Sequence, residues 1–545
     1  MIHTFNNSND KVLANGDLSS GNNKPVWYDT QLQPIQFETL DKDTQTEVLI
    51  IGGGIAGLTT AYALIKEGKK IVLIDDGYIG SGESGRTTAQ ITAMLGIGYA
   101  DIEKTFDKKT AELVANSQME AIQYIANTIR DLNIDCDFKR VEGYLFLDPS
   151  DTKENLEEEY EATKRAGLIT QMLNHIPNIT NGNNKWCIEF TEQAEFNILK
   201  YLKGLANAIV GLGGKIYTKT RADKISKSGA TANGFNIATQ FIIVATNTPV
   251  NDWIDIHTKQ WPYRTYVIAT KVQKGKYPHA LWNDTGDQNS KWIAKPYHYV
   301  RLQDFDANYD LMLIGGSDHR TGQANDEQIP EQDRYLKLET WAKENFPDIG
   351  DIEYKWSGQV INSLDGLAFL GKNPGDDNIY IITGDNGNGT TNATIGAIII
   401  NDLIHNRVNP WEKVYNPSRI ILKTTLDYLH EMGNMLAQFG DWLTSEAVKS
   451  TEFLKQGEGA IVSSGMKKMA AYRDKNNILH TCTAVCPHLG GILQWNEDEK
   501  TFDCPLHGSR FTTNGIAING PAITDLEKII IQEDPALILK EEKVY

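Results

Sequence analysis

Two cysteine–histidine pairs near the C-terminal end have the residue types and the spacing of a metal centre. Cys486 and His488 form a C-x-H pair, and Cys504 and His507 form a C-x-x-H pair after fifteen intervening residues. Two thiolates and two imidazoles on two loops suit a [2Fe–2S] cluster in which the cysteines hold one iron and the histidines hold the other. Glycines and prolines beside the four ligands would let each loop turn tightly and would stiffen it.

Zinc is the alternative occupant, because two cysteines and two histidines also complete a tetrahedral Zn²⁺ site. Zinc fingers, however, usually place two ligands about two to four residues apart and continue into a helix, whereas short strands and turns surround these pairs. From about Gly457 onward, including Trp495 and the run 508–511, the chain resembles Rieske domains. The resemblance favours a [2Fe–2S] cluster. We expect Cys482, which precedes Cys486 by four residues, to be a core residue of the preceding strand.

The resemblance also indicates how this centre differs from other Rieske centres. Those of respiratory cytochrome complexes carry one further cysteine in each loop and join the loops by a disulfide, whereas Gly491 and Leu506 stand at these positions here. Ser509 is present to donate to a cluster sulfur, but Phe511 replaces a tyrosine often found nearby. With fewer donors to the sulfurs, we expect a reduction potential in the lower half of the Rieske range of about −150 to +300 mV.

A second motif, near the N-terminal end, has the form G-x-G-x-x-G of a dinucleotide-binding turn. Gly52, Gly54 and Gly57 lie between an apolar run of strand length, 48–51, and a helical pattern. They would allow, respectively, the tight turn, the approach of a pyrophosphate and the close packing of the helix on the strand. Asp75 ends the next buried strand and would accept hydrogen bonds from a ribose. The alternative is a glycine-rich turn without a ligand, which the position of this acid disfavours.

Three later features favour FAD over NAD. They are the segment 80–88 after the second strand, the strand 241–244 that ends in Ala-Thr-Asn, and the glycine-rich loop 383–392 that begins another helix. A second helix N-terminus would stabilise the negative charge of a reduced isoalloxazine, although that loop alone could be a structural turn. The predicted cofactor-binding residues are Gly52, Gly54, Gly57, Asp75, Ser84, Arg86, Thr87, Thr88, Gly384, Gly387, Gly389 and Thr391.

Taken in order, these features resemble a known family. The 52–57 motif, the 80–88 segment, the turn 365–371 and the loop 384–391 are similar to the D-amino-acid oxidase superfamily of FAD proteins, over about 27–403. The resemblance implies an α/β, Rossmann-like FAD-binding domain with an interleaved α+β substrate domain, followed here by a small all-β Rieske domain. In that family the substrate C–N bond lies over the flavin. We expect the FAD to be bound non-covalently.

Two polar segments, 296–301 and 315–323, interrupt the strands of the middle sheet, on which the resemblance places the substrate contacts. Their arginines could pair with a substrate carboxylate through both arms of the guanidinium. The aromatic residues of the first segment could orient or deprotonate an amine. The alternative for each residue is structural, since aromatic residues on strands usually pack and arginines usually form surface ion pairs. The candidates are Tyr297, His298, Tyr299, Arg301 and Arg320.

The order of these features also predicts the domain organisation. Residues 1–45 would be a tail and lead-in, 46–410 the FAD-dependent oxidoreductase, 411–455 a helical connector and 456–545 the Rieske domain. Within the oxidoreductase, FAD-binding segments would span about 46–100, 195–250 and 355–410, and the substrate domain about 101–194 and 251–354. Apolar residues recur at three- and four-residue steps over 420–443, where a helix packed on the body is favoured over one lying on a membrane because few basic residues are present.

Composition limits the partners and the location of the protein. A chain of 545 residues is too long for one core, and its net charge of −18 at pH 7 argues against binding to nucleic acid or to an anionic membrane surface. Five cysteines are too few for a disulfide scaffold. The N-terminal residues lack the features of a signal peptide, and the apolar runs are too short for a membrane span. We therefore expect a cytoplasmic protein.

Two functions fit the two motifs. In the first, a small-molecule amine or amino acid reduces FAD by two electrons, and the Rieske cluster passes them singly to an external acceptor; flow from an external donor in the reverse direction also fits. In the second, the protein transfers electrons between flavin and cluster without an organic substrate of its own, as a reductase does. The lack of a second nucleotide fingerprint for NAD(P)H disfavours the second function. A redox or metal sensor is a third interpretation, which no nucleic-acid-binding motif supports.

Overall fold

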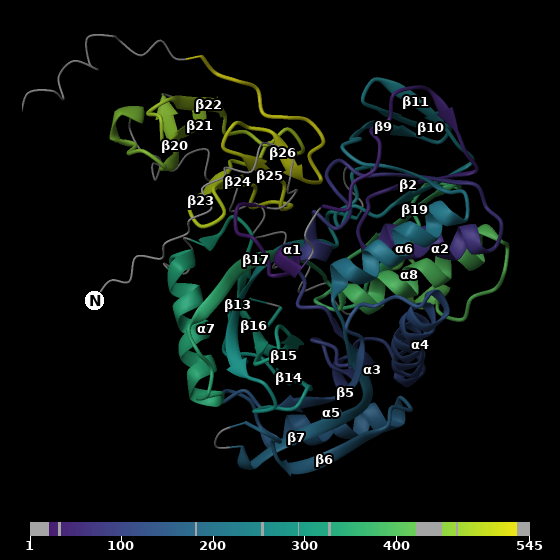
Figure 1. The fold of residues 1–545 in the computed structure, drawn as a ribbon, viewed down its shortest axis with the longest axis vertical. Coiled ribbons are helices and arrows are strands. Elements are labelled where there is room, and N and C mark those ends of the chain that lie inside the picture. The colour runs from purple at the N-terminus through teal and green to yellow at the C-terminus, as the bar shows by residue number, and fades with distance from the viewer. Residues whose placement is uncertain are drawn as a thin grey trace, which may run out of the picture.

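The computed structural model of the protein describes residues 21–30, 34–179, 182–251, 256–292, 294–324, 329–420, 450–464 and 467–530. Two large sheets with their helices form the body, and a lobe of short C-terminal strands lies against one end of it (Figure 1). Almost all of the stretch 420–443, predicted as a connecting helix, lies outside the described residues. Across the described ranges, no helix combines the length and the apolar character needed to cross a bilayer.

The first large sheet is built from buried apolar strands that are far apart in the sequence. These strands are β2 (Val48–Ile51), β3 (Ile71–Ile74), β8 (Lys215–Tyr217), β12 (Phe241–Val244), β18 (Phe369–Lys372) and β19 (Ile379–Thr383). Their order is β18-β19-β12-β2-β3-β8, with β18 antiparallel to β19 and the other neighbours parallel. Because both faces of such a sheet are covered, its strands read as continuous apolar runs.

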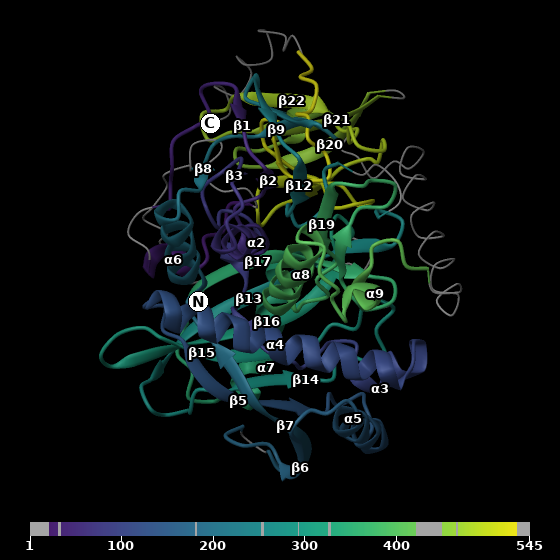
Figure 2. The same ribbon diagram turned by 90° about the vertical axis from the view of Figure 1, so that its right-hand side faces the viewer.

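Helices cover one face of this sheet and a small sheet covers the other. Helices α2 (Ile55–Lys66), α6 (Ile198–Gly211) and α8 (Gly389–Ile404) form the helical layer (Figure 2). The small sheet consists of β1 (Thr44–Gln45), β9 (Ala222–Ser226), β10 (Gly229–Ala232) and β11 (Phe235–Ala238). Ile50 packs in the helical layer, whereas its neighbour Leu49 packs toward the small sheet, as strand alternation requires. Helices α2 and α8 both begin at the carboxyl edge of the large sheet, where open α/β sheets bind ligands.

The second large sheet has nine strands and is mixed. They are β4 (Gln90–Ile91), β5 (Lys139–Phe146), β6 (Thr170–His175), β7 (Asn183–Glu195), β13 (Gln260–Gln273), β14 (Leu281–Asp284), β15 (Tyr299–Asp304), β16 (Tyr309–Arg320) and β17 (Ile352–Ser363). The order is β17-β13-β16-β15-β14-β5-β7-β4, and β6 pairs with β7. Helix α7 (Glu331–Asn345) covers one face of this sheet, and α4 (Lys108–Leu132) packs on α8. The sheet continues past the boundary predicted at 354, because β17 pairs with β13 as far as Ser363.

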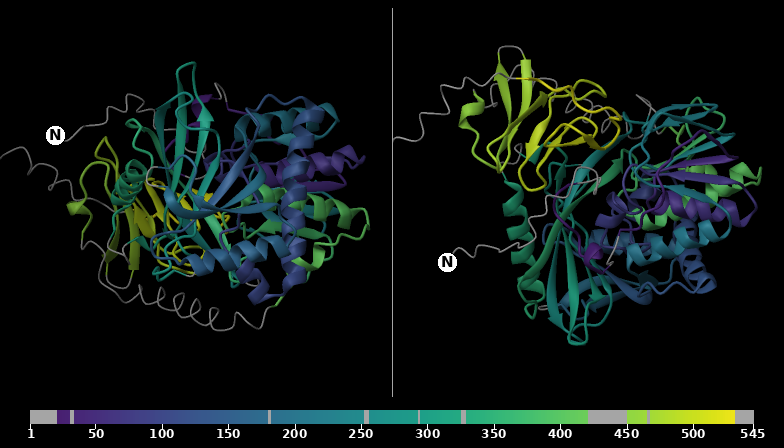
Figure 3. Two further views of the ribbon diagram at one scale, coloured as in Figure 1. Left: turned by 90° about the horizontal axis from the view of Figure 1, so that it is seen from below. Right: turned by 45° about the horizontal axis from the view of Figure 1, so that its top comes forward.

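The C-terminal lobe is all-β in its described part, as predicted. Its strands are β20 (Gly459–Ser464), β21 (Lys467–Arg473), β22 (Leu479–Thr483), β23 (Gln494–Asn496), β24 (Thr501–Asp503), β25 (Arg510–Thr512) and β26 (Ala517–Asn519). They form one three-stranded and one four-stranded sheet around a small core that includes Phe502 and Phe511. Cys482 is buried in this core, which confirms its predicted role. The lobe, in yellow-green and yellow, lies over one end of the second large sheet, next to β13 and β17 (Figure 3).

Candidate active site and metal centre

One cavity of about 660 Å³ lies where the two glycine-rich loops meet the second large sheet. Cavities that bury a whole ligand of drug size typically measure about 300–1,000 Å³. Most of the predicted cofactor-binding residues line this cavity: Gly52, Gly54, Asp75, Ser84, Arg86, Thr87, Thr88, Gly387, Gly389 and Thr391. Gly57 and Gly384 do not line it; Gly57 packs beneath the turn against Gly52, and Gly384 packs against Phe369. The two motifs, more than 300 residues apart in the chain, therefore form one site.

The N-terminal turn leaves no room for side chains. Gly52 has a φ of +111°, and a Cβ built on it would lie 2.3 Å from the Ala245 carbonyl oxygen. A Cβ on Gly57 would lie 1.9 Å from the Gly52 carbonyl oxygen. Helix α2 then begins with Gly54 as its N-cap, and Ser84 Oγ accepts a hydrogen bond from the Ile55 N–H at 3.0 Å. The positive end of the helix thus borders the cavity, as binding of a pyrophosphate requires.

Asp75 is fixed at the edge of the same turn. Its carboxylate accepts hydrogen bonds from the N–H groups of Gly53, at 2.6 Å, and Gly77, at 2.8 Å. Burial, together with the neighbouring charge of Asp76, raises the pKa of Asp75 to about 7. The carboxylate lines the cavity at the position where the fingerprint predicts a ribose contact.

A Gly57→Ala substitution is expected to abolish most FAD binding. The added methyl group would meet a backbone oxygen that cannot rotate away, and overpacking of this kind costs about 1–3 kcal/mol or more. The measurement is the ratio of released flavin to protein, with the signal of the iron–sulfur cluster as an internal check that the lobe is intact. Gly211→Ala is the control, since a Cβ there meets nothing within 4 Å. Full flavin occupancy in Gly57→Ala would contradict the assignment of this turn.

The second glycine-rich loop forms the opposite wall. Gly384 and Gly387 have φ values of +72° and +83°, and helix α8 begins at Gly389 with Asn388 as its N-cap. The side-chain amide of Asn388 donates to the Met94 carbonyl at 2.9 Å, which fixes the loop against the N-terminal segment. The helix N-terminus therefore faces the cavity, as predicted for a flavin ring.

Arg86 lines the cavity, but its guanidinium is directed elsewhere. The group donates to the Ser357 carbonyl at 2.6 Å, to Glu499 Oε1 at 2.8 Å and to the carbonyls of Gly21 and Asn23. Both terminal nitrogens of the guanidinium thus donate to protein groups, so the predicted contact of this guanidinium with the cofactor is corrected to a contact with the protein. The reason is that Glu499, buried in the Rieske lobe, requires a cationic partner.

Two tyrosines at the start of β15 face the cavity, Tyr299 on the strand and Tyr297 two residues before it. Tyr297 and Tyr299 both line it, and the Tyr297 hydroxyl lies 2.7 Å from where a Cβ of Gly387 would stand. Burial, with added repulsion from Asp318 and Asp385, raises the pKa of Tyr297. Tyr297 is therefore protonated at neutral pH. It can donate a hydrogen bond to a substrate, and its raised pKa disfavours the predicted role as a base.

His298 and Arg301 do not line the cavity. The His298 ring stacks on Trp341 with 4.0 Å between centroids, and its Nδ1 lies 2.7 Å from Asp284 Oδ2. It faces away because neighbouring residues on an extended chain point to opposite sides. Arg301 is fully buried, and its guanidinium donates to the carbonyls of Ala89 and Phe196. The predicted catalytic roles of both residues are corrected to structural ones.

Arg320 is the last residue of β16 and does not line the cavity. Its guanidinium lies over the rings of Trp261 and Tyr263, at 5.6 and 5.9 Å from the centroids. Its charge also acts on the imidazole of His507, whose pKa is lowered mainly by burial. The predicted pairing of Arg320 with a substrate carboxylate is therefore corrected. This cation belongs to the surroundings of the metal centre.

The four predicted cluster ligands converge in the C-terminal lobe. Cys486, His488, Cys504 and His507 are all buried, and the two imidazole centroids lie 5.0 Å apart. The thiols of the two cysteines are within hydrogen-bonding distance of each other. No described residue bonds to Nδ1 of His507, so this buried nitrogen is available as a ligand. The donor set and its burial fit a [2Fe–2S] cluster with two cysteine and two histidine ligands.

Two residues predicted to distinguish this centre lie beside the ligands. A Cβ on Gly491 would lie 2.8 Å from Leu506, so the two loops touch where respiratory Rieske proteins are expected to carry a disulfide. All five cysteines are free thiols. The Ser509 hydroxyl hydrogen-bonds to Cys486, which places the predicted donor on a ligand sulfur.

The cluster loops face the oxidoreductase. The amide of Gln359 donates to the Gly508 carbonyl at 3.2 Å, and the amide of Gln323 donates to the Pro505 carbonyl at 3.4 Å. The buried His257 ring lies 4.9 Å from the ring of His488 and 5.6 Å from that of His507, between centroids. The histidine side of the cluster site is therefore packed against the flavoprotein.

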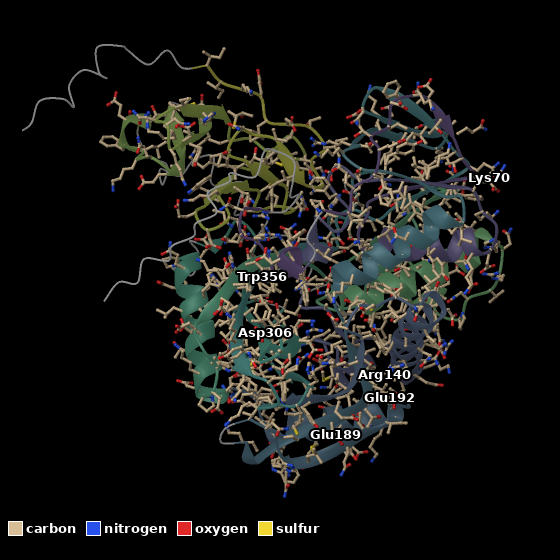
Figure 4. The ribbon with its side chains drawn as sticks, in the orientation of Figure 1. Lys70, Arg140, Glu189, Glu192, Asp306 and Trp356 are labelled. Atoms are coloured by element: carbon tan, nitrogen blue, oxygen red, sulfur yellow. The ribbon has the colours of Figure 1, made fainter. Side chains whose placement is uncertain are left out.

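A buried ion pair anchors the lobe. Glu499 Oε1 accepts from Arg86 at 2.8 Å and from the Ser357 hydroxyl at 2.6 Å, and it lies 3.5 Å from Arg264. Burial alone would raise the pKa of Glu499, but the charges of Arg86 and Arg264 lower it to about 2. Trp356, labelled in Figure 4, completes the anchor by donating to the Arg86 carbonyl at 2.8 Å. Sequence reasoning missed Glu499, since its partners lie hundreds of residues away.

Comparison with known proteins agrees with both halves of the site. The family described as "FAD dependent oxidoreductase" matches residues 47–403, and the "Rieske [2Fe-2S] domain" matches residues 444–530. A Rieske 2Fe-2S iron–sulfur protein of Bacillus subtilis (strain 168), YhfW, is 32% identical over 512 residues, which cover 92% of this chain and 97% of that protein. The gamma-glutamylputrescine oxidoreductase of Escherichia coli (strain K12) is 25% identical and covers 68% of this chain and 85% of its own.

A solved structure supports the fold. Glycine oxidase from Geobacillus kaustophilus superposes with a TM-score of 0.55 at 16% identity, over 69% of this chain and all of that chain. The family match spans more than half of the chain, and a relative above 30% identity shares nearly its whole length. The chain therefore belongs to the FAD-dependent oxidoreductase family, carries a C-terminal Rieske domain, and binds FAD and a [2Fe–2S] cluster.

Proposed function

We propose that this protein oxidises the C–N bond of an amine or an amino acid and passes the electrons from FAD to the Rieske cluster and on to an external acceptor. Bound FAD supplies a two-electron acceptor at the cavity, and the cluster supplies a one-electron carrier. The name of the Escherichia coli relative, an oxidoreductase of gamma-glutamylputrescine, supports a nitrogen-containing substrate. The predicted cytoplasmic location and the external acceptor belong to the same proposal.

The observation that carries the proposal is that β16 and the turn that follows it connect the two sites. Asp318, near the end of this strand, lines the cavity. Four residues later, a Cβ on Gly322 would lie 2.9 Å from Pro505, which is next to the ligand Cys504. At about 3.3 Å per residue, four residues of chain span at most about 13 Å, so the Cα atoms of Asp318 and Gly322 lie no farther apart than that. The substrate wall and the cluster loop are thus near neighbours.

The Rieske lobe also forms part of the wall of the FAD cavity. Ala517, Ile518 and Asn519 of β26 line it, and the Asn519 amide donates to Glu83 Oε1 at 2.9 Å. Glu83 belongs to the segment that follows the dinucleotide turn. The lobe therefore shares a wall with the flavin site, which supports direct electron exchange between the cofactors.

Anaerobic reduction tests this function. A panel of amines and amino acids is added to the oxidised holoenzyme, and the flavin absorbance and the EPR signal of the reduced cluster are recorded. We expect at least one compound to bleach the flavin, with the EPR signal following. If NADH or NADPH reduced the protein while no member of the panel did, the protein would be an electron-transfer protein without an amine substrate. Bleaching that left the cluster oxidised would contradict the proposed electron path.

A further inference from the structure

We propose that the substrate is a cationic amine without a carboxylate on its reacting carbon, and that Asp318 receives its ammonium group. This inference rests on the proposed oxidation of a C–N bond and narrows the substrate class. It assigns a role to a residue in one of the polar segments of the middle sheet, where the arginines had been the candidates.

The wall around Asp318 is shaped by an irregularity in the sheet. Strands β13 and β16 pair with a register shift between Arg264 and Tyr266, and Ser317 on the facing strand has a φ of +59°. Such bulges bend a strand and redirect side chains, often next to active sites. Here Thr265 and Asp318 both line the cavity. The carboxylate is thus placed on the same wall as the two tyrosines.

A chain of hydroxyl groups ends at this carboxylate. The Thr265 hydroxyl hydrogen-bonds to Asp318, and it lies 2.7 Å from the Tyr299 hydroxyl. Because an ionised carboxylate can only accept, Thr265 donates to Asp318 and Tyr299 donates to Thr265. Oδ1 of Asp318 is buried, and no described residue donates to it. An acceptor held in this way lacks the partner that a buried charge requires.

Cations are not available on this wall to receive a substrate carboxylate. Among the described lining residues, the arginines are Arg86 and Arg221, and each forms an ion pair with a carboxylate of the Rieske lobe, Glu499 and Asp525 respectively. Two lysines also line the cavity: Lys104 forms ion pairs with Asp101 and Glu158, and Lys295 is exposed, with its ammonium at the side-chain oxygen of a glutamine. Recognition of an α-carboxylate usually relies on a bidentate guanidinium. The described wall presents acceptors instead.

The local charge balance also favours a cation. Burial raises the pKa values of Asp318 and Asp385 to about 7, and both line the cavity. The hydrogen bond from Thr265 and the electrostatic effects of His298 and Arg334 lower the pKa of Asp318, but they only partly offset the effect of burial. Arg334 also donates to the Ser317 carbonyl at 3.2 Å from helix α7, on the other side of the sheet. An ammonium ion in the cavity would neutralise charge that the protein leaves uncompensated there.

Asp318 can also take one proton from the bound ammonium. In this step an N–H bond of the ammonium breaks, an O–H bond forms on the carboxyl group, and no electrons are transferred. The amine becomes neutral, which is the form that can lose hydride. A carboxyl group with a pKa near 7 can hold such a proton at neutral pH.

The test compares matched compounds on the holoenzyme. Pentylamine and cadaverine are compared with norleucine and lysine, which differ by an α-carboxylate, through the KM and kcat of anaerobic flavin reduction. Binding of tert-butylamine, which has no hydrogen on the carbon next to nitrogen, is measured by calorimetry as a readout that does not depend on turnover. The variants are Asp318→Asn and Asp318→Glu. Asp310→Asn is the control, a buried aspartate at the other end of β16 outside the cavity lining.

We expect the amines to have the lower KM, and Asp318→Asn to weaken tert-butylamine binding by about thirtyfold or more, as loss of one partner of a buried charge pair does. Asp318→Glu should retain part of the affinity, and Asp310→Asn should match the wild type. Preference for the amino acids, no binding of tert-butylamine by the wild type, or wild-type binding by Asp318→Asn would each overturn the inference. Oxidation of norleucine independent of Asp318 would leave the proposed function standing, whereas no flavin reduction by any compound would reject both.

Discussion

A Cys504→Ser variant is expected to lose the iron–sulfur cluster and to keep its flavin. Cys504 is buried beside Cys486, and a cluster held by two thiolates and two imidazoles cannot spare a thiolate. The turn that binds FAD lies in a separate sheet with its own core. Iron and acid-labile sulfide should therefore fall to near background, and the EPR signal should vanish, while the flavin content stays near that of the wild type.

In Cys504→Ser, the flavin and the downstream acceptor should respond differently when substrate is added. The flavin should still bleach, but transfer to a one-electron acceptor should be largely lost, because the carrier between them is missing. Cys482→Ser provides the control, since this cysteine packs in the lobe core with its Sγ 3.9 Å from the Ala470 carbonyl. A Cys504→Ser protein that retained the EPR signal, or a wild-type protein that contained zinc and no iron, would refute the cluster assignment.

A Glu499→Gln substitution should undock and destabilise the Rieske lobe. It leaves the buried guanidinium groups of Arg86 and Arg264 without a carboxylate, and breaking a buried pair in this way costs about 3–5 kcal/mol. We expect a lower thermal midpoint for the lobe, faster proteolysis between the domains and slower transfer of electrons from flavin to cluster. Glu497→Gln is the control, because Glu497 is partly exposed and pairs with Lys500 at the surface, where such pairs contribute about 0–1 kcal/mol.

The carboxylate of Glu499 also makes the stability of the fold depend on pH. The pKa of Glu499 is about 2 in the folded protein against an ordinary value of 4.5. Because its pKa is lowered on folding, the ionised carboxylate makes its full contribution to stability above pH 4.5. That contribution is lost as the pH falls from about 4.5 to about 2. The wild type should therefore lose stability over this interval more steeply than Glu499→Gln. Equal slopes, with a lobe that stays docked in the variant, would show that the pair does not anchor the domain.

Short-range motifs were predictable from the sequence because their geometry is local. The pairs of cluster ligands, the glycines of both loops and the buried strands can each be recognised from residues that lie a few positions apart in the sequence. Gly57 can be recognised from its distance to Gly52 alone. In the structure the four cysteine and histidine side chains lie together, and the two glycine-rich loops border one cavity.

Arginine roles were not predictable in the same way. Arg86 pairs with Glu499, which is 413 residues away, and Arg301 donates to carbonyls more than 100 residues away. Nothing beside these residues indicates such partners. The polar segment 315–323 was recognised as unusual, but the residue that faces the cavity is Asp318 rather than Arg320, because a register shift that the sequence does not reveal redirects the chain.

The packing of His257 against both cluster histidines has a consequence for how the protein exchanges electrons. The histidine side of the cluster site is already in contact with the flavoprotein, so the proposed transfer from flavin to cluster needs no diffusive encounter between the two. We therefore expect the rate of this step to be independent of solvent viscosity. Under the proposed function, only the exchange with the external acceptor would then depend on a diffusing molecule.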